Sequence, residues 1–431
     1  MPLRPLGFNV FGHFSSSVGL GAAARNTAAL LSESPYAFSV TDYPIEGHEL
    51  GHPHGFEAAE RPAYRGMPFG VNVFHMEPNI LDGRLRREWA LLPTGRRLNA
   101  LVPFWELSRL PRPWVDPLRA VDFVLAPSLH IKTVFEADAP NTAVIHYPQT
   151  VSVPGDITPD RARWSLPESD VVFLTSFDAL SDVARKNPVG SIEAFQRAFG
   201  LADHAMLVVH MKNAHRDSRY AEEVRRVQAF ARSDARIRLI ERTLDRDDLL
   251  SLYASVDVLV SLHRAEGLGL VLMECMALGT PVIATGWSGN MDFTDTTNSG
   301  LVGYTMVPAQ GTMDYYRPEY MQIEAEWAEP SVDDAATWMR RLAVDPDLRA
   351  RLGERARRDI AERSKTAARL SAFDHLASAY HEGLLESPSH RAAVIHIRGA
   401  RTAALSRAVS SPIRIVRGLR RTISSSRGRE S

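Results

Sequence analysis

The stretch Val256–Thr285 constrains what this chain can fold into more than any other part of the sequence. Its apolar start predicts a β-strand, and the apolar run Leu270–Leu278 predicts a buried helix. That helix is expected to end at Gly279, because glycine suits the left-handed residue after a helix and the proline two positions later cannot continue one. The last four residues of the stretch predict a second strand. Together they form a βαβ unit, whose loop at the carboxyl end of the first strand is a place where such units bind ligands.

The loop of this unit has the features of an anion-binding site. Gly267 and Gly269 allow the backbone to approach a ligand closely. The amide groups near Gly269, Leu270 and Val271 lack partners in the first helical turn, and they suit a phosphate or a diphosphate. We therefore expect a phosphate-bearing ligand at the start of this helix.

Two glutamates, Glu266 and Glu274, flank the start of the helix. Glu274 lies among apolar residues, where a carboxylate needs a partner, and helical side chains lean toward the N-terminus. Its carboxylate is therefore expected to bind the two adjacent hydroxyls of a ribose whose diphosphate occupies the helix end. Glu266 is expected to face the group beyond the diphosphate. The alternative is an acid in a surface loop and a second acid that only stabilises the helix start.

These motifs resemble a known family signature. They are the loop Glu266–Gly269, the run Ala277–Ala284 (Ala-Leu-Gly-Thr-Pro-Val-Ile-Ala) and Ser288-Gly289-Asn290. Together they resemble the donor site of retaining GT-B glycosyltransferases of family 4, the glycosyl transferases group 1, of the bacterial polysaccharide type. The resemblance implies transfer of a hexose from a nucleotide diphosphate-sugar to a hydroxyl of a glycan or lipid-linked acceptor. It gives Glu266 a catalytic role and the other residues of the loop and helix a donor-binding role, and it implies no cofactor.

A basic pair, Arg185 and Lys186, follows the expected strand Val171–Ser176. Two adjacent cations facing the Glu266 loop would neutralise a departing diphosphate. The pair resembles the phosphate-binding pair of the same family, in which an arginine lies several residues before the lysine. Phe177 and Asp178 occupy that area here, so Arg185 must substitute or the arginine role is absent. We expect no metal, because the cations do the same electrostatic work and no Asp-x-Asp run follows a strand.

Three features of the first half are candidates for the same site. Gly19 and Gly21 follow the expected strand Phe8–Phe11, and Arg25 lies on the helix expected after them. In the resembling family this glycine loop lies near the donor phosphate and the acceptor. The alternative is an ordinary tight turn.

On the acceptor side the candidates are Arg25, His75 at the end of an expected strand, and Trp105 and Glu106 shortly after the next one. Trp105 offers a face on which a sugar can stack, and Glu106 offers a hydrogen-bond acceptor. A Trp-Glu-Leu run at this place belongs to the acceptor-side domain of many members of the resembling family. The alternatives are a structural histidine and a tryptophan that anchors the core.

Both halves repeat the order strand, loop, helix, so we predict an α/β protein of two doubly wound Rossmann-like domains facing across a cleft, the GT-B architecture. The proline-bearing stretch Val151–Glu168 is the expected linker. We assign residues 1–160 to the acceptor-side domain and 161–345 to the donor-binding domain. Residues 346–386 are expected to form helices that partly cross back to the first domain, and 387–431 a basic tail.

The charge is distributed unevenly although the net charge is only −1. Ser389–Ser431 holds ten arginines, no lysine and one acid, a net charge of +9, so the remainder carries −1 − 9 = −10. Apolar residues recur three or four apart from Ile413, which indicates either a basic amphipathic helix on an anionic membrane or a disordered tail. The overall balance gives no reason to expect a nucleic-acid partner.

Cysteine usage and hydropathy bear on the location of the protein. The single cysteine, Cys275, excludes a disulfide framework within the chain, which fits a reducing cytoplasm. No stretch approaches about 18 uncharged apolar residues, and the N-terminus has no continuous apolar segment typical of a signal peptide. We expect a cytoplasmic protein, with peripheral contact on the inner face of the membrane as a hypothesis.

Other functions are compatible with parts of this pattern. A GT-B nucleotide-sugar epimerase would share the donor motifs but needs no acceptor region around Trp105 and Glu106. A nucleotide-sugar-binding subunit without catalysis would not need Glu266, Glu274 and Lys186 together. A Rossmann dehydrogenase is disfavoured, because no Gly-x-Gly-x-x-Gly is followed by an acid about 20 residues on.

Overall fold

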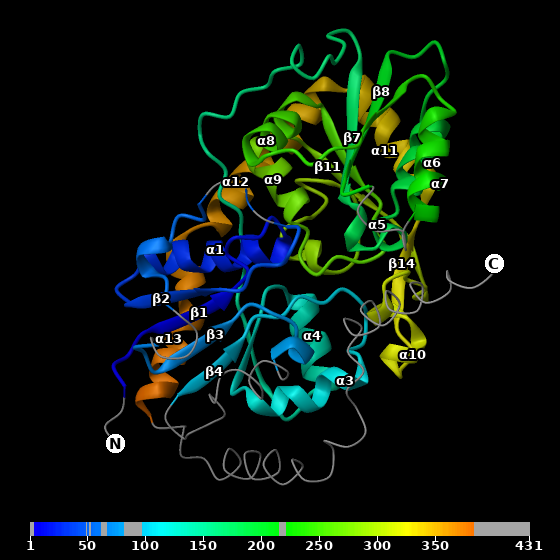
Figure 1. Cartoon of the computed structure of the whole chain (residues 1–431). Helices are drawn as coiled ribbons and strands as arrows, with labels where there is room; N and C mark the ends of the chain where they lie inside the picture. Colours follow the sequence, from blue (N-terminus) through cyan, green and yellow to red (C-terminus); the bar gives the residue numbers. More distant parts are fainter. Residues whose placement is uncertain are drawn as a thin grey trace, which may run out of the picture.

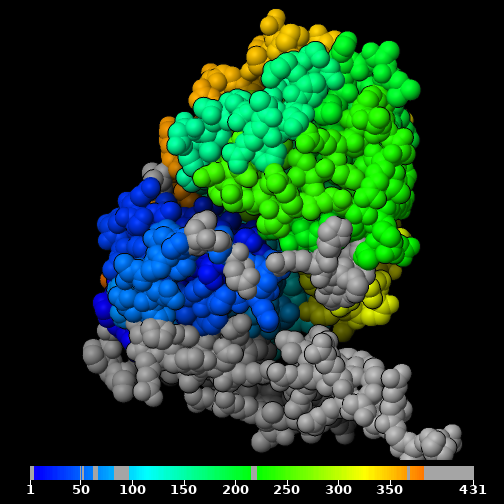
Figure 2. All heavy atoms as spheres, turned by 45° about the horizontal axis from the view of Figure 1, so that its top comes forward, coloured from blue at the N-terminus to red at the C-terminus, as the bar shows by residue number. Residues whose placement is uncertain are grey.

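The computed structural model describes residues 4–48, 50, 53–61, 67–81, 97–214 and 221–382. These residues form two lobes, each built on one parallel β-sheet. Figure 2 shows the lobes as two masses, the first blue and the second mostly green, in contact along a shared boundary. Within the described residues, no helix has both the length and the apolar character needed to cross a membrane. The predicted basic tail of residues 387–431 lies outside the described part.

The N-terminal lobe is organised by a six-stranded sheet with the order β2-β1-β3-β4-β5-β6, in which all neighbours pair in parallel. Its strands are β1 (Phe8–Gly12), β2 (Phe38–Asp42), β3 (Val71–Phe74), β4 (Leu98–Leu101), β5 (Phe123–Ala126) and β6 (Ala143–His146). Almost every residue of β1 to β5 is buried, as expected for a parallel sheet covered on both faces. The strand order reverses between β1 and β3, so ligands are expected beyond the carboxyl ends of these two strands.

The C-terminal lobe has a second six-stranded parallel sheet, with the order β12-β11-β10-β7-β8-β9. Its strands are β7 (Val171–Asp178), β8 (Ala205–Lys212), β9 (Ile237–Ile240), β10 (Val258–Ser261), β11 (Val282–Thr285) and β12 (Gly300–Val302). The order reverses between β7 and β10, which is the crevice where doubly wound folds bind nucleotides. The predicted fold class, two doubly wound lobes facing across a cleft, is confirmed.

Helices cover both sheets (Figure 1). The α-helices are α1 (Gly19–Ser32), α3 (Arg112–Val115), α4 (Leu129–Asp138), α5 (Val183–Lys186), α6 (Pro188–Ala198), α7 (Ala221–Arg232), α8 (Arg246–Ser255), α9 (Leu270–Leu278), α10 (Pro318–Met321), α11 (Val332–Val344), α12 (Pro346–Arg363) and α13 (Thr366–His381). The short 3-10 helices are η1 (Glu57–Ala59), η2 (Asp116–Ala120), η3 (Ala179–Ser181), η5 (Gly289–Asp292) and η6 (Asp314–Tyr316).

The last two helices cross from one lobe to the other. α12 packs on α9 in the C-terminal lobe, where Gly353 lies so close to the Gly279 carbonyl oxygen that a Cβ would come within 2.0 Å of it. α13 packs under the first sheet, and the rings of Phe373 and Phe8 meet edge to face at 5.0 Å. Figure 1 shows these two helices, in orange, on different lobes.

An antiparallel hairpin also connects the lobes. β13 (Tyr304–Pro308) pairs with β14 (Glu326–Pro330), and η6 and α10 lie between them. The hairpin belongs to the C-terminal lobe by sequence, yet its Glu326 forms two hydrogen bonds with Ser108 of the N-terminal lobe. The Ser108 amide donates to the Glu326 carbonyl at 3.2 Å, and the Glu326 amide donates to the Ser108 hydroxyl at 2.8 Å. Trp114 Nε1 donates to the Tyr320 hydroxyl at 3.1 Å. The hairpin is therefore a structural bridge beside the cleft.

Candidate active site

A cleft of about 1260 Å³ opens between the lobes, at the carboxyl ends of the strands on both sides of the two switch points. All of the residues predicted for the site line it except Gly21 and His75. The lining residues among them are Gly19, Arg25, Trp105, Glu106, Arg185, Lys186, Glu266, Gly267, Gly269, Leu270, Val271 and Glu274. The fold thus brings together residues that lie as much as 255 positions apart, from Gly19 to Glu274.

The basic pair lies on α5, a single turn that follows β7 and η3. Asp182 caps this turn, since its Oδ1 accepts from the Arg185 amide at 2.9 Å. Asp182 has φ +65°, a backbone conformation that asparagine and aspartate tolerate better than most other residues. The Arg185 guanidinium is buried, and it donates to the carbonyls of Ala265 at 2.7 Å and Ser181 at 2.8 Å.

Glu266 forms ion pairs with both Lys186 and Arg185. Lys186 Nζ donates to Glu266 Oε1, and Arg185 lies 3.7 Å from Oε2. Burial opposes ionisation of Glu266, but Lys186 and Arg185 outweigh burial and hold its pKa at about 2. The Glu266 amide is fixed by the Ser288 hydroxyl at 2.9 Å. Glu266 is therefore an ionised carboxylate held in one place at the centre of the cleft.

The start of α9 is open to the cleft. Gly269 has φ +97°, the left-handed region that favours glycine, and it turns the chain into the helix without a side-chain cap. The amides at this helix end carry the positive end of the helix dipole. Leu270 and Val271 line the cleft beside it. This geometry can hold an anionic group, as the sequence predicts.

Glu274, one turn into α9, is 7% exposed and accepts a hydrogen bond from Arg246. Among the described residues no partner hydrogen-bonds its second oxygen. Arg246, the first residue of α8, is not among the residues predicted for the site. A signal was present: a cation in the first turn of a helix opposes the helix dipole, so it needs a partner elsewhere.

The first loop of the N-terminal lobe lies across the cleft from α9. Gly19 begins α1 and lines the cleft, whereas Gly21 is packed inside the turn, where a Cβ would lie 2.5 Å from the carbonyls of His13 and Ser16. Arg25 braces this loop by donating to the carbonyls of Phe14 at 2.7 Å and Ser16 at 3.1 Å. Burial and the charge of Arg246 lower the pKa of Arg25 to about 10.

Lys212 is a second residue that sequence analysis missed. It ends β8, and its Nζ donates to the Ser17 carbonyl of the other lobe at 2.5 Å and lies 3.7 Å from Asp178. The signal was the polar end of this strand, since carboxyl ends of parallel strands meet at the ligand edge. Lys186, Lys212, Arg25 and Arg246 together give this part of the cleft four cations.

On the acceptor side Trp105 is only 1% exposed. Its Nε1 donates to the Arg109 carbonyl at 2.8 Å, and its ring packs on Trp114 with the centroids 4.7 Å apart. This burial leaves Trp105 no open ring face, so its contribution is that of a core anchor. Glu106 points into the cleft region, accepts from the Tyr316 hydroxyl at 2.6 Å and lies 3.6 Å from Arg185.

His75 is fully buried below the cleft lining. Neither ring nitrogen has a hydrogen-bond partner in the described part of the chain, and burial lowers its pKa to about 3. His75 is therefore neutral at neutral pH and is placed in the core of the N-terminal lobe.

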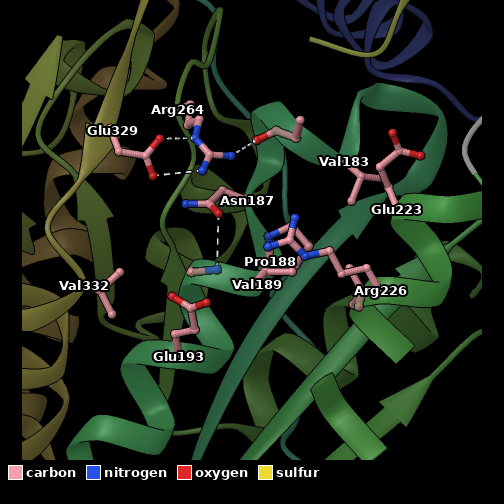
Figure 3. Close-up of a pocket in the computed structure, with 13 residues that line it drawn as sticks. Val183, Asn187, Pro188, Val189, Glu193, Glu223, Arg226, Arg264, Glu329 and Val332 are labelled. Atoms are coloured by element: carbon pink, nitrogen blue, oxygen red, sulfur yellow. Dashed lines mark hydrogen bonds and ion pairs between the residues drawn. The ribbon is translucent and has the colours of Figure 1, made fainter. Parts of the chain in front are cut away.

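A smaller cavity of about 170 Å³ lies beside α5 and is lined by residues of α5, α6, α7 and β14 (Figure 3). The Arg264 guanidinium pairs there with both oxygens of Glu329, and its backbone amide donates to the Arg185 carbonyl at 2.7 Å. The cavity contains none of the predicted site residues. Arg264 thus ties the loop of Glu266 to the helix of the basic pair from outside the cleft.

The architecture agrees with solved structures of known proteins. Sucrose-phosphate synthase from Thermosynechococcus elongatus superposes with a TM-score of 0.63 at 14% identity, covering 89% of this chain and 100% of that one. A glycosyltransferase from Rickettsia africae gives 0.62 at 13% identity, covering 89% and 99%. HepE from Anabaena, in complex with UDP-glucose, gives 0.58 at 14% identity, covering 88% and 99%. The fold is the GT-B fold of glycosyltransferases.

The evidence for the family comes from sequence matches to part of the chain. Residues 184–312 match the family model described as glycosyl transferases group 1. A sulfoquinovosyl transferase, SQD2 from Arabidopsis thaliana, is 31% identical over 117 residues, which are 27% of this chain and 19% of that relative. The matched segment includes Lys186, Glu266 and Glu274. This segment belongs to the glycosyl transferases group 1 family, and the resemblance drawn from the sequence is confirmed.

Proposed function

We propose that the protein is a retaining glycosyltransferase that moves a hexose from a nucleotide diphosphate-sugar to a hydroxyl of a glycan or lipid-linked acceptor. The observation that carries this proposal is the Glu266–Lys186 pair at the open start of α9, with Glu274 one turn further on. The helix start suits the diphosphate, and the Lys186 cation suits the charge that develops on the leaving group. The carboxylates of Glu266 and Glu274 suit the hydroxyls of the donor sugar and of the ribose.

The proposed donor is a UDP-hexose. HepE, which shares the fold, is described in complexes with UDP, with UDP and glucose, and with UDP-glucose. In our proposal the diphosphate lies on the amides of Gly269, Leu270 and Val271, and the ribose hydroxyls donate to Glu274. Glu266 accepts from hydroxyls of the hexose, for which its low pKa keeps it ionised.

The two cations have different proposed roles. The Arg185 side chain is 5% exposed and its donors are directed at Ala265, Ser181 and two glutamates, so it fixes Glu266. The Lys186 side chain is 19% exposed, and one shift of its flexible end transfers it from Glu266 to the departing diphosphate. Because cations stabilise the leaving group, we propose that turnover needs no metal ion.

We propose that each lobe binds one of the two substrates. Residues 1–160 bind the acceptor, 161–345 bind the donor, and 346–386 link them. For the basic tail of residues 387–431 we propose contact with an anionic membrane surface. A chain truncated after Leu385 should then lose sedimentation with vesicles containing anionic lipid, and sedimentation equal to that of the full chain would contradict the contact.

The proposed function is tested by thermal-shift screening against UDP-, GDP-, dTDP- and ADP-sugars, followed by detection of released nucleotide. A UDP-hexose should raise the melting temperature most, and UDP should be released faster when a glycan acceptor is added. Interconversion of UDP-sugars without any acceptor would indicate an epimerase instead. Donor binding with no release or transfer would indicate a non-catalytic subunit.

A further inference from the structure

Two groups of charged residues line the cleft. Arg25, Lys212 and Arg246 lie at the end beside α9, where we propose that the nucleotide binds. Glu77, Glu106 and the ring of Tyr315 line the other end, which is completed by the apolar side chain of Ile80. We call these last four residues the acidic end. Arg185 lies 3.6 Å from Glu106 of the acidic end.

Glu77 is the residue that points most directly to a ligand. It follows β3 at the switch point of the first sheet and directly precedes the helical residues 78–81. Its side chain is half-buried in the cleft wall. Its carboxylate interacts with its own backbone amide, and no other side chain in the described ranges hydrogen-bonds or pairs with it. Burial and the neighbouring Glu106 raise its pKa above the usual value. A carboxylate in this position is stabilised by any group that donates hydrogen bonds to it.

Glu106 supplies a second carboxylate in a fixed orientation. Its Oε2 accepts from the Tyr316 hydroxyl at 2.6 Å, and its Oε1 lies 3.6 Å from Arg185. A carboxylate has about four lone-pair positions, so Glu106 can still accept from a ligand. Because the hydroxyl of Tyr316 is supplied by the hairpin, this orientation depends on contact between the lobes.

Tyr315 gives the acidic end an aromatic wall. Its ring lines the cleft and packs edge to face against Tyr316 with the centroids 4.7 Å apart. Apolar faces of sugar rings pack against aromatic rings, while their hydroxyls hydrogen-bond to carboxylates. Tyr315, Glu77 and Glu106 all line this cleft.

We propose that the acidic end binds the acceptor as a sugar residue that presents hydroxyl or amino groups and carries no phosphate or carboxylate. The proposal rests on the proposed function, since it names the substrate class of the same cleft. An anionic sugar would place its charge beside Glu77 and Glu106. Neighbouring like charges repel each other strongly where water is partly excluded. Hydroxyl or ammonium groups would instead satisfy the carboxylate of Glu77.

The test is ligand-observed NMR of the full chain in the presence of UDP. Methyl glucoside and glucosamine serve as probes without negative charge, and glucose 6-phosphate and glucuronic acid serve as anionic probes. The uncharged and amino probes should bind at least about tenfold more tightly than the anionic ones. Glu77→Gln should reduce this preference by about fivefold, because it removes one of the two charges. Glu136→Gln, which alters an exposed acid paired with Lys132 in the same lobe, should leave it unchanged.

Two results would overturn the proposal: anionic probes that bind as tightly as the others, or a preference that Glu77→Gln leaves unchanged. Absence of binding by every probe would overturn it as well. Calorimetric binding of a UDP-hexose is measured separately on the same protein. Failure there would count against the donor site, whereas the probe preference reports on the acidic end alone.

Discussion

The Tyr316 hydroxyl donates a hydrogen bond of 2.6 Å to Glu106, across the boundary between the two lobes. Tyr316 lies on the hairpin of the C-terminal lobe, and Glu106 follows β4 of the N-terminal lobe. Both residues also contact Arg185, since its guanidinium lies 3.6 Å from Glu106 and 6.0 Å from the centre of the Tyr316 ring. This contact joins the acceptor side of the cleft to the helix that carries the basic pair.

Tyr316→Phe should therefore destabilise the protein more than a matched change in the same hairpin. It removes a hydrogen bond to a carboxylate, for which we expect a loss of about 2 kcal/mol in the free energy of unfolding. Tyr320→Phe removes only a contact between neutral groups, with Trp114, and should cost about 1 kcal/mol. Urea unfolding of both variants gives the comparison, and a larger loss for Tyr320→Phe would argue against the role assigned to Glu106.

Lys186→Ala should slow turnover much more than it weakens donor binding. Lys186 is proposed to stabilise charge that develops as the diphosphate departs, so its loss should reduce the rate of UDP release by about 10². Donor affinity, measured by calorimetry, should change by no more than about threefold, because the amides of α9 remain. Lys132→Ala, an exposed lysine paired with Glu136, is the control. A variant with full turnover would remove Lys186 from the mechanism.

The pH dependence of stability should show the environment of Glu266. Its pKa is lowered from 4.5 to about 2 in the folded protein, so its ion pairs stabilise the fold above pH 4.5. As pH falls from about 4.5 to 2 the unfolded chain takes up the proton first, and stability falls by up to about 3 kcal/mol. Glu266→Gln should flatten the curve in this window. Identical slopes for both proteins would show that the pairing is weak in solution.

The parts of the site that are contiguous in sequence could be predicted from the sequence. The order of strand, loop, helix and strand around Glu266 is local, and the structure places β10, α9 and β11 within one to two residues of the predicted ends. Gly269 and Gly279 both have the positive φ that their positions suggested. Local propensity and local turn chemistry determine these features, so they can be predicted from one sequence alone.

Contacts between distant segments could not be predicted. Residues 308–326 carry no periodic pattern of apolar residues, because η6 and α10 are too short to show a period. Tyr316 meets Glu106 over a separation of 210 residues, and no local pattern records such a pair. β2 was not expected, and the helical region of residues 345–380 divides into α12 and α13 at Ser364 and Lys365 without a proline or glycine.

Contacts between distant segments also decide which residues line the acceptor side of the cleft. A Trp-Glu pair after a strand can place either residue in a cleft, and which of them is buried depends on packing against Trp114 and the hairpin. The structure buries Trp105 and leaves Glu106 at the cleft, with Tyr315 as the aromatic residue that lines it. A carboxylate and an aromatic ring both line the cleft here, but a residue distant in sequence supplies the ring.

The central claim is that a nucleotide diphosphate-sugar is anchored at the start of α9 with its ribose on Glu274. The most direct measurement is calorimetric titration of the wild-type protein and of Glu274→Ala with a UDP-hexose, with Glu193→Ala, outside the cleft, as the control. We expect Glu274→Ala to weaken binding by at least about tenfold, while Glu193→Ala binds like the wild type. Equal affinity of all three proteins for the UDP-hexose would contradict it.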